Sequence, residues 1–308
     1  MSGLVSIIIP IYKGKRFITK TVNSILEQDY KNFELLLIND GCPDDSGTII
    51  EQISAMDKRI KCFHKSNGGV ADARLFGIKR AKGDIIAFCD QDDLWTKDKL
   101  SRQMPLFEDP NVGLVHCGAI KDDINLGVAF RPKLHPELQG QIFDQLVQKN
   151  RIVSCTVVTR KSLLQQCNAF DRDKSIMGVD DWLAWLKISL ACKVGYVQDY
   201  LAVRTIHGDN YSLIEEKMHQ AEITCIDKIQ TLSANYHHKV NYPKLKNQIH
   251  KRYASSYINN GNFRLGAMSF WQAHECYSDT YALFKAIIYR TTPVPLLTQL
   301  QSIYRRVC

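Results

Sequence analysis

The first part of the chain, up to about residue 100, alternates between continuous apolar runs and segments whose apolar residues recur with helical spacing. The apolar runs are "LVSIIIPIY", "FELLLIND", "IKCFHK" and "DIIAFCD", and a further run, "NVGLVHCGAI", follows them. Segments such as "KGKRFITKTVNSILEQ" and "VADARLFGIKRA" separate the first four runs. Because buried parallel strands read as near-continuous apolar runs joined by helices, this pattern predicts βαβ units. The expected fold class is α/β, with a mostly parallel sheet covered by helices on both faces.

The alternation weakens after about residue 120 and gives way to a helical pattern near residue 214. "RIVSCTVVTRKSLLQQC" reads as a strand followed by a helix, "VDDWLAWLKISLAC" as a helix and "VGYVQDYLAVRTIH" as a strand. From Glu215 onward the chain reads as helical throughout. We therefore expect a domain over residues 1–214, divided into halves 1–120 and 121–214, and a helical C-terminal region over 215–308.

Cysteine usage and the N-terminal segment indicate the compartment. No run approaches the ~20 apolar residues that span a bilayer. The N-terminal "MSGLVSIIIPIYKGK" has no basic residue before its short apolar run, so a secretory signal is not expected. The ten cysteines form no C-x-x-C pair, and several lie inside apolar runs, which is typical of reduced core residues rather than of structural zinc. We expect a cytoplasmic protein.

The net charge of +8 suggests an anionic partner, such as nucleic acid, a lipid surface or a phosphorylated small molecule. Half of this excess lies between Thr280 and Cys308, where there is no acidic residue. The basic residues of this segment are Lys285, Arg290, Arg305 and Arg306. The segment can dock on the cytoplasmic face of an anionic membrane, as basic amphipathic segments do. Packing on the rest of the chain or on a second subunit explains it equally well.

Polar and aromatic side chains follow the first four apolar runs. In an open α/β sheet, ligands bind at the carboxyl ends of the parallel strands. The residues at these positions are Pro10, Tyr12, Asp40, Asn67, Arg74, Asp90, Asp92 and Asp93. Carboxylates this crowded repel one another unless a positive charge lies among them. These residue types suit a nucleoside diphosphate. An aromatic ring can flank the base, an acid can accept from a ribose hydroxyl, and carboxylates can hold Mg²⁺ against the pyrophosphate.

Each of these residues also has a plainer interpretation. Asp40 before a glycine is typical of a turn, and an arginine such as Arg74 on a helix is commonly a solvated one. Asp92 or Asp93 is suitable as the cap of a helix beginning near Thr96. A cap accounts for one acid of the cluster, but not for three.

The segments "VSIIIPIYK", "FELLLINDG" and "NGGVADARLFGIKRAKGDIIAFCDQDD" together resemble glycosyltransferase family 2, the inverting enzymes with the GT-A fold. The resemblance covers about residues 4–212 and implies a GT-A-type, Rossmann-like sheet. It also implies a nucleotide-binding half over 1–120 and an acceptor and catalytic half over 121–214. The implied donor-binding residues are Pro10, Tyr12 and Asp40 at the base and ribose, Asn67 and Arg74 near the nucleotide, and Asp90, Asp92 and Asp93. Of these, Asp92 and Asp90 are the implied ligands of Mn²⁺ or Mg²⁺.

Two motifs in the second half extend the resemblance. "GVDDWLAWLKIS" matches the acidic pair that opens a Trp- and Leu-rich helix, which implies that Asp181 is the general base. Helix capping explains Asp180 about as well as a direct role does. "VRTIHGDNYS" matches an Arg-x-x-His segment that closes over the donor phosphates, and so implies a role for Arg204 and His207.

Two departures from the family pattern bear on donor preference. Lys13 stands where the family usually has Asn after Pro-x-Tyr. The second run ends in Asn39-Asp40-Gly41-Cys42 rather than the common Asp-Asp-Gly-Ser. Both departures leave the matched acid in place, and both are suited to tuning the preference for a base or a sugar.

The resemblance implies a metal-dependent, inverting transfer of a hexosyl or N-acetylhexosaminyl group, with a UDP-sugar as the expected donor. The expected acceptor is a glycan or a lipid-linked oligosaccharide of cell-surface polysaccharide synthesis. No nucleic-acid partner is expected, and a homo-oligomer remains open. A sugar-nucleotide nucleotidyltransferase is one alternative, although "PIYKGKRF" is a poor version of its Gly-rich basic loop. A non-catalytic nucleotide-sugar-binding protein is another, and the intact Asp181 argues against it.

Overall fold

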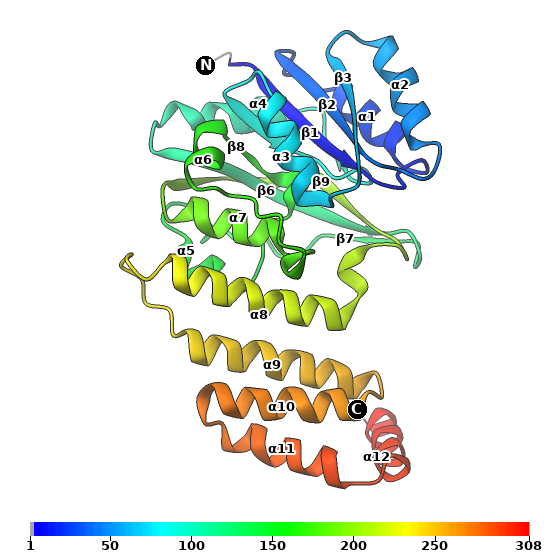
Figure 1. Cartoon of the computed structure of the whole chain (residues 1–308), viewed down its shortest axis with the longest axis vertical. Coiled ribbons are helices and arrows are strands. Elements are labelled where there is room, and N and C mark those ends of the chain that lie inside the picture. Colours follow the sequence, from blue (N-terminus) through cyan, green and yellow to red (C-terminus); the bar gives the residue numbers. More distant parts are fainter. Residues whose placement is uncertain (1–2, 308) are drawn as a thin grey trace. The chain divides into compact units, whose positions relative to one another are not determined.

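The computed structural model describes the backbone of residues 3–307 and the side chains of that range except 300 and 303–307. The chain forms two compact units, of which the first ends at Leu213 and the second begins at Ile214 (Figure 1). The side chains of Arg305 and Arg306, which contribute to the basic segment of the sequence, lie outside the described residues.

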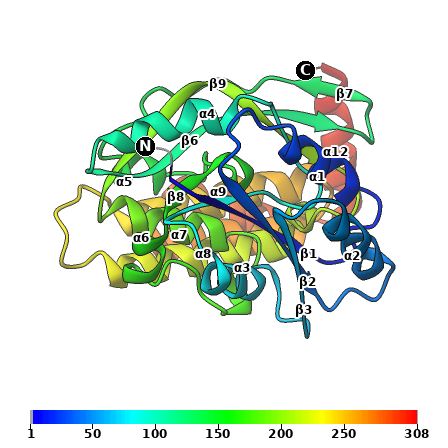
Figure 2. The same ribbon diagram turned by 90° about the horizontal axis from the view of Figure 1, so that it is seen from above.

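The first unit is built on a nine-stranded sheet with the order β3-β2-β1-β4-β8-β6-β9-β5, in which β7 pairs with β6. The strands are β1 (Val5–Ile11), β2 (Phe33–Asp40), β3 (Ile60–Lys65), β4 (Ile85–Phe88), β5 (Leu94–Trp95), β6 (Val112–Asp123), β7 (Val128–Phe130), β8 (Val158–Arg160) and β9 (Lys193–Ile206). Strands β1 to β4 pair in parallel, as do β6 and β9, whereas β5, β7 and β8 pair antiparallel. Figure 2 shows β1, β2 and β3 side by side at one end of the sheet. The predicted mostly parallel α/β fold is confirmed.

Helices connect these strands. The α-helices of the first unit are α1 (Ile18–Leu26), α2 (Ser46–Met56), α3 (Val70–Arg80), α4 (Lys99–Gln103), α5 (Phe143–Leu146), α6 (Lys161–Gln166) and α7 (Asp180–Ser189). Short 3₁₀ helices span Met104–Glu108, Ser154–Thr156, Lys174–Ile176 and Tyr211–Leu213. The helix expected near Thr96 begins at Lys99 and follows Asp98, so neither Asp92 nor Asp93 caps it.

Strand β1 is buried along its whole length because helices cover both faces of the sheet. Ile7 and Ile9 belong to one core cluster with Ile18 and Val22 of α1. On the opposite face, α3 approaches so closely that a Cβ on Gly77 would lie 2.7 Å from Cγ2 of Ile8. This two-sided burial explains why the first four strands read as continuous apolar runs.

The second unit consists of helices α8 (Glu215–Leu232), α9 (Tyr242–Asn259), α10 (Phe263–Tyr277), α11 (Thr280–Thr291) and α12 (Val294–Val307). Figure 1 shows α8 to α11 as successive layers. Phe263 and Phe270 of α10 pack with Ala282 of α11 and Leu297 of α12 in a separate core. Among the described residues, no helix is long and apolar enough to cross a membrane. The expected helical C-terminal region is confirmed.

Candidate active site

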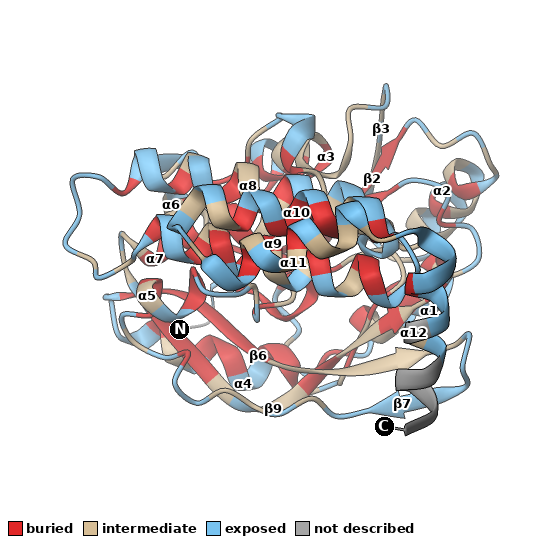
Figure 3. Cartoon of the chain, turned by 90° about the horizontal axis from the view of Figure 1, so that it is seen from below, coloured by how far each residue is buried: buried red, intermediate tan, exposed pale blue. Residues whose placement is uncertain are grey.

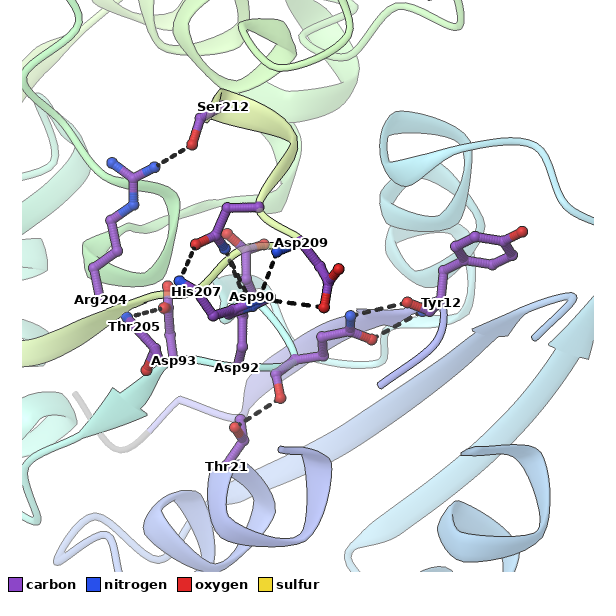
Figure 4. A network of polar contacts seen from close by, with 12 residues as sticks. Tyr12, Thr21, Asp90, Asp92, Asp93, Arg204, Thr205, His207, Asp209 and Ser212 are labelled. Carbon is purple, nitrogen blue, oxygen red and sulfur yellow. Dashed lines mark hydrogen bonds and ion pairs between the residues drawn. The ribbon is translucent and has the colours of Figure 1, made fainter. Parts of the chain in front are cut away.

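The ends of β1 and β4 are joined by Gln91, the middle residue of the Asp-Gln-Asp motif. Its Oε1 accepts from the backbone N–H of Tyr12 at 2.9 Å, and its Nε2 donates to the carbonyl of Tyr12 at 2.9 Å. The hydroxyl of Thr21 donates to the carbonyl of Gln91 at 2.8 Å. A Cβ on Gly14 would lie 2.3 Å from Oε1 of Gln91, so a larger residue here would displace the Gln91 amide from Tyr12. Figure 4 shows the Tyr12 ring pointing away from the aspartates.

The three clustered aspartates each have a different partner. Oδ1 of Asp90 accepts from Arg74 at 2.8 Å, and Oδ2 of Asp92 lies 2.8 Å from Nε2 of His207. Asp93 is turned into the core, where Oδ1 accepts from the backbone N–H of Thr205 at 3.0 Å. Protein partners therefore relieve much of the repulsion within the cluster. Only Asp90 and Asp92 lie at the rim, while the burial of Asp93 raises the pKa of its carboxyl well above the usual range.

His207 is held in place from several sides. Its backbone N–H donates to Oδ1 of Asn210 at 2.6 Å, and its ring stacks on Phe17 with centroids 4.6 Å apart. Nδ2 of Asn210 also donates to Oδ2 of Asp92 at 3.2 Å. Burial raises the pKa of Asp92, with a further contribution from Asp90, while the hydrogen bond from His207 opposes the rise. The structure thus brings together Asp92 and His207, which sequence reasoning assigned to the same site.

Arg204, the partner of His207 in the Arg-x-x-His segment, points elsewhere. Its Nη2 donates to the hydroxyl of Ser212 at 3.0 Å. Figure 4 shows the side chain directed toward Ser212 rather than toward the aspartates. In this arrangement Ser212 engages one guanidinium nitrogen of Arg204, and the role of Arg204 at the donor phosphates stays a prediction.

Arg74 connects the two halves of the first unit. Its Nη1 lies 2.6 Å from Oδ2 of Asp180, and its Nη2 bonds both Asp90 and the hydroxyl of Ser154, the latter at 3.0 Å. The side chain is buried, so the interpretation as a solvated helix residue is wrong. Burial alone would lower the pKa of Arg74, but Asp90 and Asp180 raise it above the ordinary value, and the guanidinium stays charged. Its Nε has no hydrogen-bond partner among the described residues.

Asp181 follows Asp180 at the start of α7. Oδ1 of Asp181 accepts from the backbone N–H of Trp182 at 2.6 Å and from Nδ2 of Asn150 at 3.2 Å. Burial, followed by the charge of Asp180, raises the pKa of Asp181 to about 7, although part of the residue reaches solvent. A carboxyl with a pKa near neutrality is suited to accepting a proton at physiological pH.

Asp40 organises the loop before α3. Its carboxylate is buried and accepts from Lys65 at 2.5 Å, from the N–H of Gly68 at 3.0 Å and from that of Gly69 at 2.8 Å. Nδ2 of Asn67 donates to the carbonyl of Asp40 at 2.9 Å. The structure therefore groups Asp40 with Asn67, apart from the Asp90 and Asp92 pair, and the roles of both at the base and ribose stay predictions.

A hollow adjoins this loop and extends to Asp180. It is lined by Gly68, Gly69, Val70, Ala71, Asp171, Arg172, Asp173, Lys174, Met177 and Asp180. Pro10, which was also predicted to bind the nucleotide, is buried inside β1. Tyr12, two residues further on, is exposed, and the role of Pro10 at the nucleotide stays a prediction.

Sequence reasoning left four residues of this arrangement without a role. Gln91 was inside a recognised motif, so its position was a usable signal. Asn210 follows His207 closely and shares its carboxylate partner. Ser154 lies in the run interpreted as a strand and Asn150 directly precedes that run, but no pattern in the sequence indicates a contact of either residue with Arg74 or Asp181.

The donor chemistry of the rim fits a hard divalent cation. Mg²⁺ and similar ions commonly use one or two protein carboxylates and complete their coordination with phosphate oxygens and water. Asp90 and Asp92 supply two carboxylates. Within residues 3–307 there is no group of three or more His, Cys, Asp or Glu side chains arranged to hold a metal by themselves. At this rim the remaining ligands of such an ion would come from phosphate oxygens or water.

Comparison with known sequences identifies the family of the chain. The sequence profile described as Glycosyl transferase family 2 matches residues 6–167, and the chain belongs to this family. An uncharacterized glycosyltransferase of Rickettsia conorii is 35% identical over 212 residues, which cover 68% of this chain and 34% of that protein. The uncharacterized glycosyltransferase EpsJ of Bacillus subtilis is 38% identical over 149 residues, covering 46% and 43% of the two chains. The chain spans about a third of the length of the first of these relatives.

Solved structures extend the likeness to the fold. S. aureus TarS 1–349 in complex with UDP-GlcNAc superposes with a TM-score of 0.66 at 17% identity, covering 98% of this chain and 91% of that one. The mannosyltransferase PcManGT from Pyrobaculum calidifontis, in complex with GDP-Man and Mn²⁺, gives 0.60 at 19% identity, covering 97% and 84%. At these identities the likeness concerns the fold, and the predicted GT-A class is confirmed.

Proposed function

We propose that this chain is an inverting, metal-dependent glycosyltransferase that uses a nucleotide-sugar donor, with a UDP-sugar as the first candidate. The observation that carries the proposal is the double ion pair of Arg74, which ties Asp90 at the strand ends to Asp180 beside Asp181. The buried guanidinium of Arg74 thus joins the candidate leaving-group site to the start of the helix that carries the candidate base. Family membership and the likeness to a protein solved with UDP-GlcNAc support the same reading.

The leaving group of such a reaction is a nucleoside diphosphate, which departs with its negative charge. Asp90 and Asp92 would hold Mn²⁺ or Mg²⁺, and a bound divalent cation supplies Lewis-acid stabilisation of that charge. His207 and Asn210 orient Asp92 by bonding its Oδ2. Arg204 would contribute positive charge to the phosphates through a turn of its side chain toward the rim. Asp93 takes no part in this proposal because its carboxylate faces the core.

Asp181 would act on the opposite side of the sugar. Its carboxylate takes the proton of the acceptor hydroxyl as the oxygen forms a bond to the anomeric carbon and the bond to the diphosphate breaks. Attack from that side inverts the anomeric configuration. General-base assistance of this kind contributes roughly 10²–10⁴-fold. The pKa of about 7 leaves a large fraction of Asp181 ionised at neutral pH.

Tyr12, Pro10, Asp40 and Asn67 would form the base and ribose end of the donor site. The exposed Tyr12 ring offers a flat apolar face, and Gln91 fixes the backbone that carries it. We propose a hexosyl or N-acetylhexosaminyl donor group, and a glycan or lipid-linked oligosaccharide of a cell-surface polysaccharide as the acceptor.

A product assay tests the proposal. The protein is incubated with Mn²⁺, with a panel of oligosaccharide acceptors and with UDP-glucose, UDP-galactose, UDP-N-acetylglucosamine or GDP-mannose, and the released nucleotide is identified by chromatography. The proposal expects a nucleoside diphosphate from at least one donor, and none from the Asp181→Asn variant. Release of pyrophosphate in the presence of a nucleoside triphosphate and a sugar phosphate would instead identify a nucleotidyltransferase. Tight donor binding without any product would identify a binding protein.

A further inference from the structure

Helix α11 exposes an apolar face. Tyr281, Phe284 and Ile287 are 57%, 61% and 49% exposed, and their spacing of three residues puts them on one side of the helix. We call these three residues the α11 face. Ala282 and Ala286, on the other side, are buried in the core of the second unit. Figure 3, coloured by burial, shows exposed segments along α11.

Two basic residues border the α11 face. With 3.6 residues per turn, Lys285 lies at one edge and Arg290 at the other. Nζ of Lys285 lies 5.5 Å from the ring centroid of Tyr281, so the ammonium group borders the aromatic surface of the α11 face. Long basic side chains at the edges of an apolar helix face can keep their charge among the lipid headgroups while the apolar face enters the boundary with the acyl chains.

The last helix does not cover this face. Leu297 of α12 is buried in the core of the second unit together with Ile258 and Phe263. Nε2 of Gln301 donates to the carbonyls of Ile258 at 2.8 Å and Asn259 at 3.0 Å. Helix α12 is thus fixed against the end of α9, and the α11 face is left open in the described part of the chain.

Charge distinguishes between the possible occupants of the α11 face. Residues 215–308 contain twelve basic and six acidic residues, so this region carries six of the eight net positive charges of the chain. A second copy would bring the same excess of positive charge to the interface, and like charges repel. An anionic lipid surface attracts the same region and accepts exposed Tyr, Phe and Ile side chains. No acidic residue between Thr280 and Cys308 opposes this attraction.

We propose that the α11 face docks this protein on an anionic phospholipid membrane, with Phe284 and Ile287 inserted at the level of the headgroups. The docking is reversible, since a single interfacial helix anchors far more weakly than a membrane-spanning one. It is independent of the transfer chemistry, because no residue of the α11 face belongs to the candidate active site.

Vesicle sedimentation tests this proposal. The wild-type chain should sediment with phosphatidylcholine vesicles that contain phosphatidylglycerol, and much less with phosphatidylcholine alone or at high salt. The double variant Phe284→Ser/Ile287→Ser should lose about tenfold or more of its binding. Met56→Ser is the matched control, because Met56 is 83% exposed on α2 of the first unit and is not part of the α11 face. Thermal melting shows whether each variant is folded.

A charge variant keeps the test decisive if the apolar variant unfolds. Lys285→Gln/Arg290→Gln should weaken binding to the anionic vesicles by about fivefold per charge removed. Equal binding to neutral and anionic vesicles, no binding at all, or full binding by folded variants would overturn the proposal. A wild-type dimer that becomes monomeric in Phe284→Ser/Ile287→Ser, with vesicle binding unchanged, would assign the α11 face to a second copy instead.

Discussion

Arg74 and Asp180 form a buried ion pair, with Nη1 of the arginine 2.6 Å from Oδ2 of the aspartate across a sequence separation of 106 residues. The pair fixes the start of α7, and therefore Asp181, relative to the turn after β4. The second guanidinium nitrogen holds Asp90 in that turn. The geometry of the candidate leaving-group site and that of the candidate base therefore depend on one side chain.

Replacing Arg74 should destabilise the first unit strongly. In Arg74→Met, Asp180 stays buried without its counter-charge, and breaking a buried pair in this way costs about 3–5 kcal/mol. Urea unfolding measures this loss. Lys79→Met, at an exposed position of the same helix, should change the unfolding free energy by no more than about 0.5 kcal/mol. An equally small effect for Arg74→Met would show that the pair is not important for stability.

Asp181→Asn should abolish turnover while preserving donor binding. The amide oxygen can still accept from the N–H of Trp182, so the local structure is kept, but the general base is lost. We expect kcat to fall by roughly 10²–10⁴-fold with little change in the Kd for the nucleotide. Asp84→Asn, at an exposed acid of the same unit, serves as the control. Wild-type turnover in Asp181→Asn would move the base to another residue.

The rate should rise with pH through the region near 7. Asp181 can accept a proton only when ionised, and its pKa is raised to about 7 by burial and by Asp180. The pH profile of kcat should therefore rise on the acid side with a midpoint near 7, in contrast to a midpoint near 4 for an ordinary aspartate. A rate that stays constant from about pH 5 to about pH 8 would contradict this role.

The contribution of Asp181 to the free energy of unfolding should fall as the pH rises, whereas the rate rises. The pKa of Asp181 is higher in the folded chain than in the unfolded chain, so the folded state binds more protons between about 4 and 7. The contribution of this group is therefore favourable in acid and is lost as the pH rises through that range. Asp181→Asn removes the dependence. The melting temperature of the variant should exceed that of the wild type by more at mildly alkaline pH than at mildly acidic pH.

Gln91 is expected to act as a positioning residue for the nucleotide. Gln91→Met removes both hydrogen bonds to the backbone of Tyr12 and frees the loop that carries the ring. Donor binding should weaken by about 1–2 kcal/mol, so the KM for the donor should rise several-fold, while kcat changes little. Gln148→Met, at an exposed site, should leave both constants unchanged. A fall in kcat at constant KM would place the effect of Gln91 on the chemical step instead.

Periodicity made the fold and the location of the site predictable. Continuous apolar runs can be buried on both faces only in a helix-covered parallel sheet, and this fixed Asp40 and Asp90 at strand ends. Periodicity gave no information about the direction of a side chain within a turn. Asp92 and Asp93 are adjacent, yet one faces the rim and the other the core. The burial of Arg74 depends on Ser154 and Asp180, which are distant in sequence and became visible as its partners only in the folded chain.

The most direct test of the account is calorimetric titration of the wild-type chain with UDP, with and without Mn²⁺, and of Asp92→Asn under the same conditions. If Asp90 and Asp92 bind a cation together with the diphosphate, UDP should bind the wild type only when Mn²⁺ is present. Asp92→Asn should then bind UDP weakly whether or not Mn²⁺ is added. Equal UDP affinity in Mn²⁺ and in EDTA, or unchanged Mn²⁺-dependent binding in Asp92→Asn, would contradict the account.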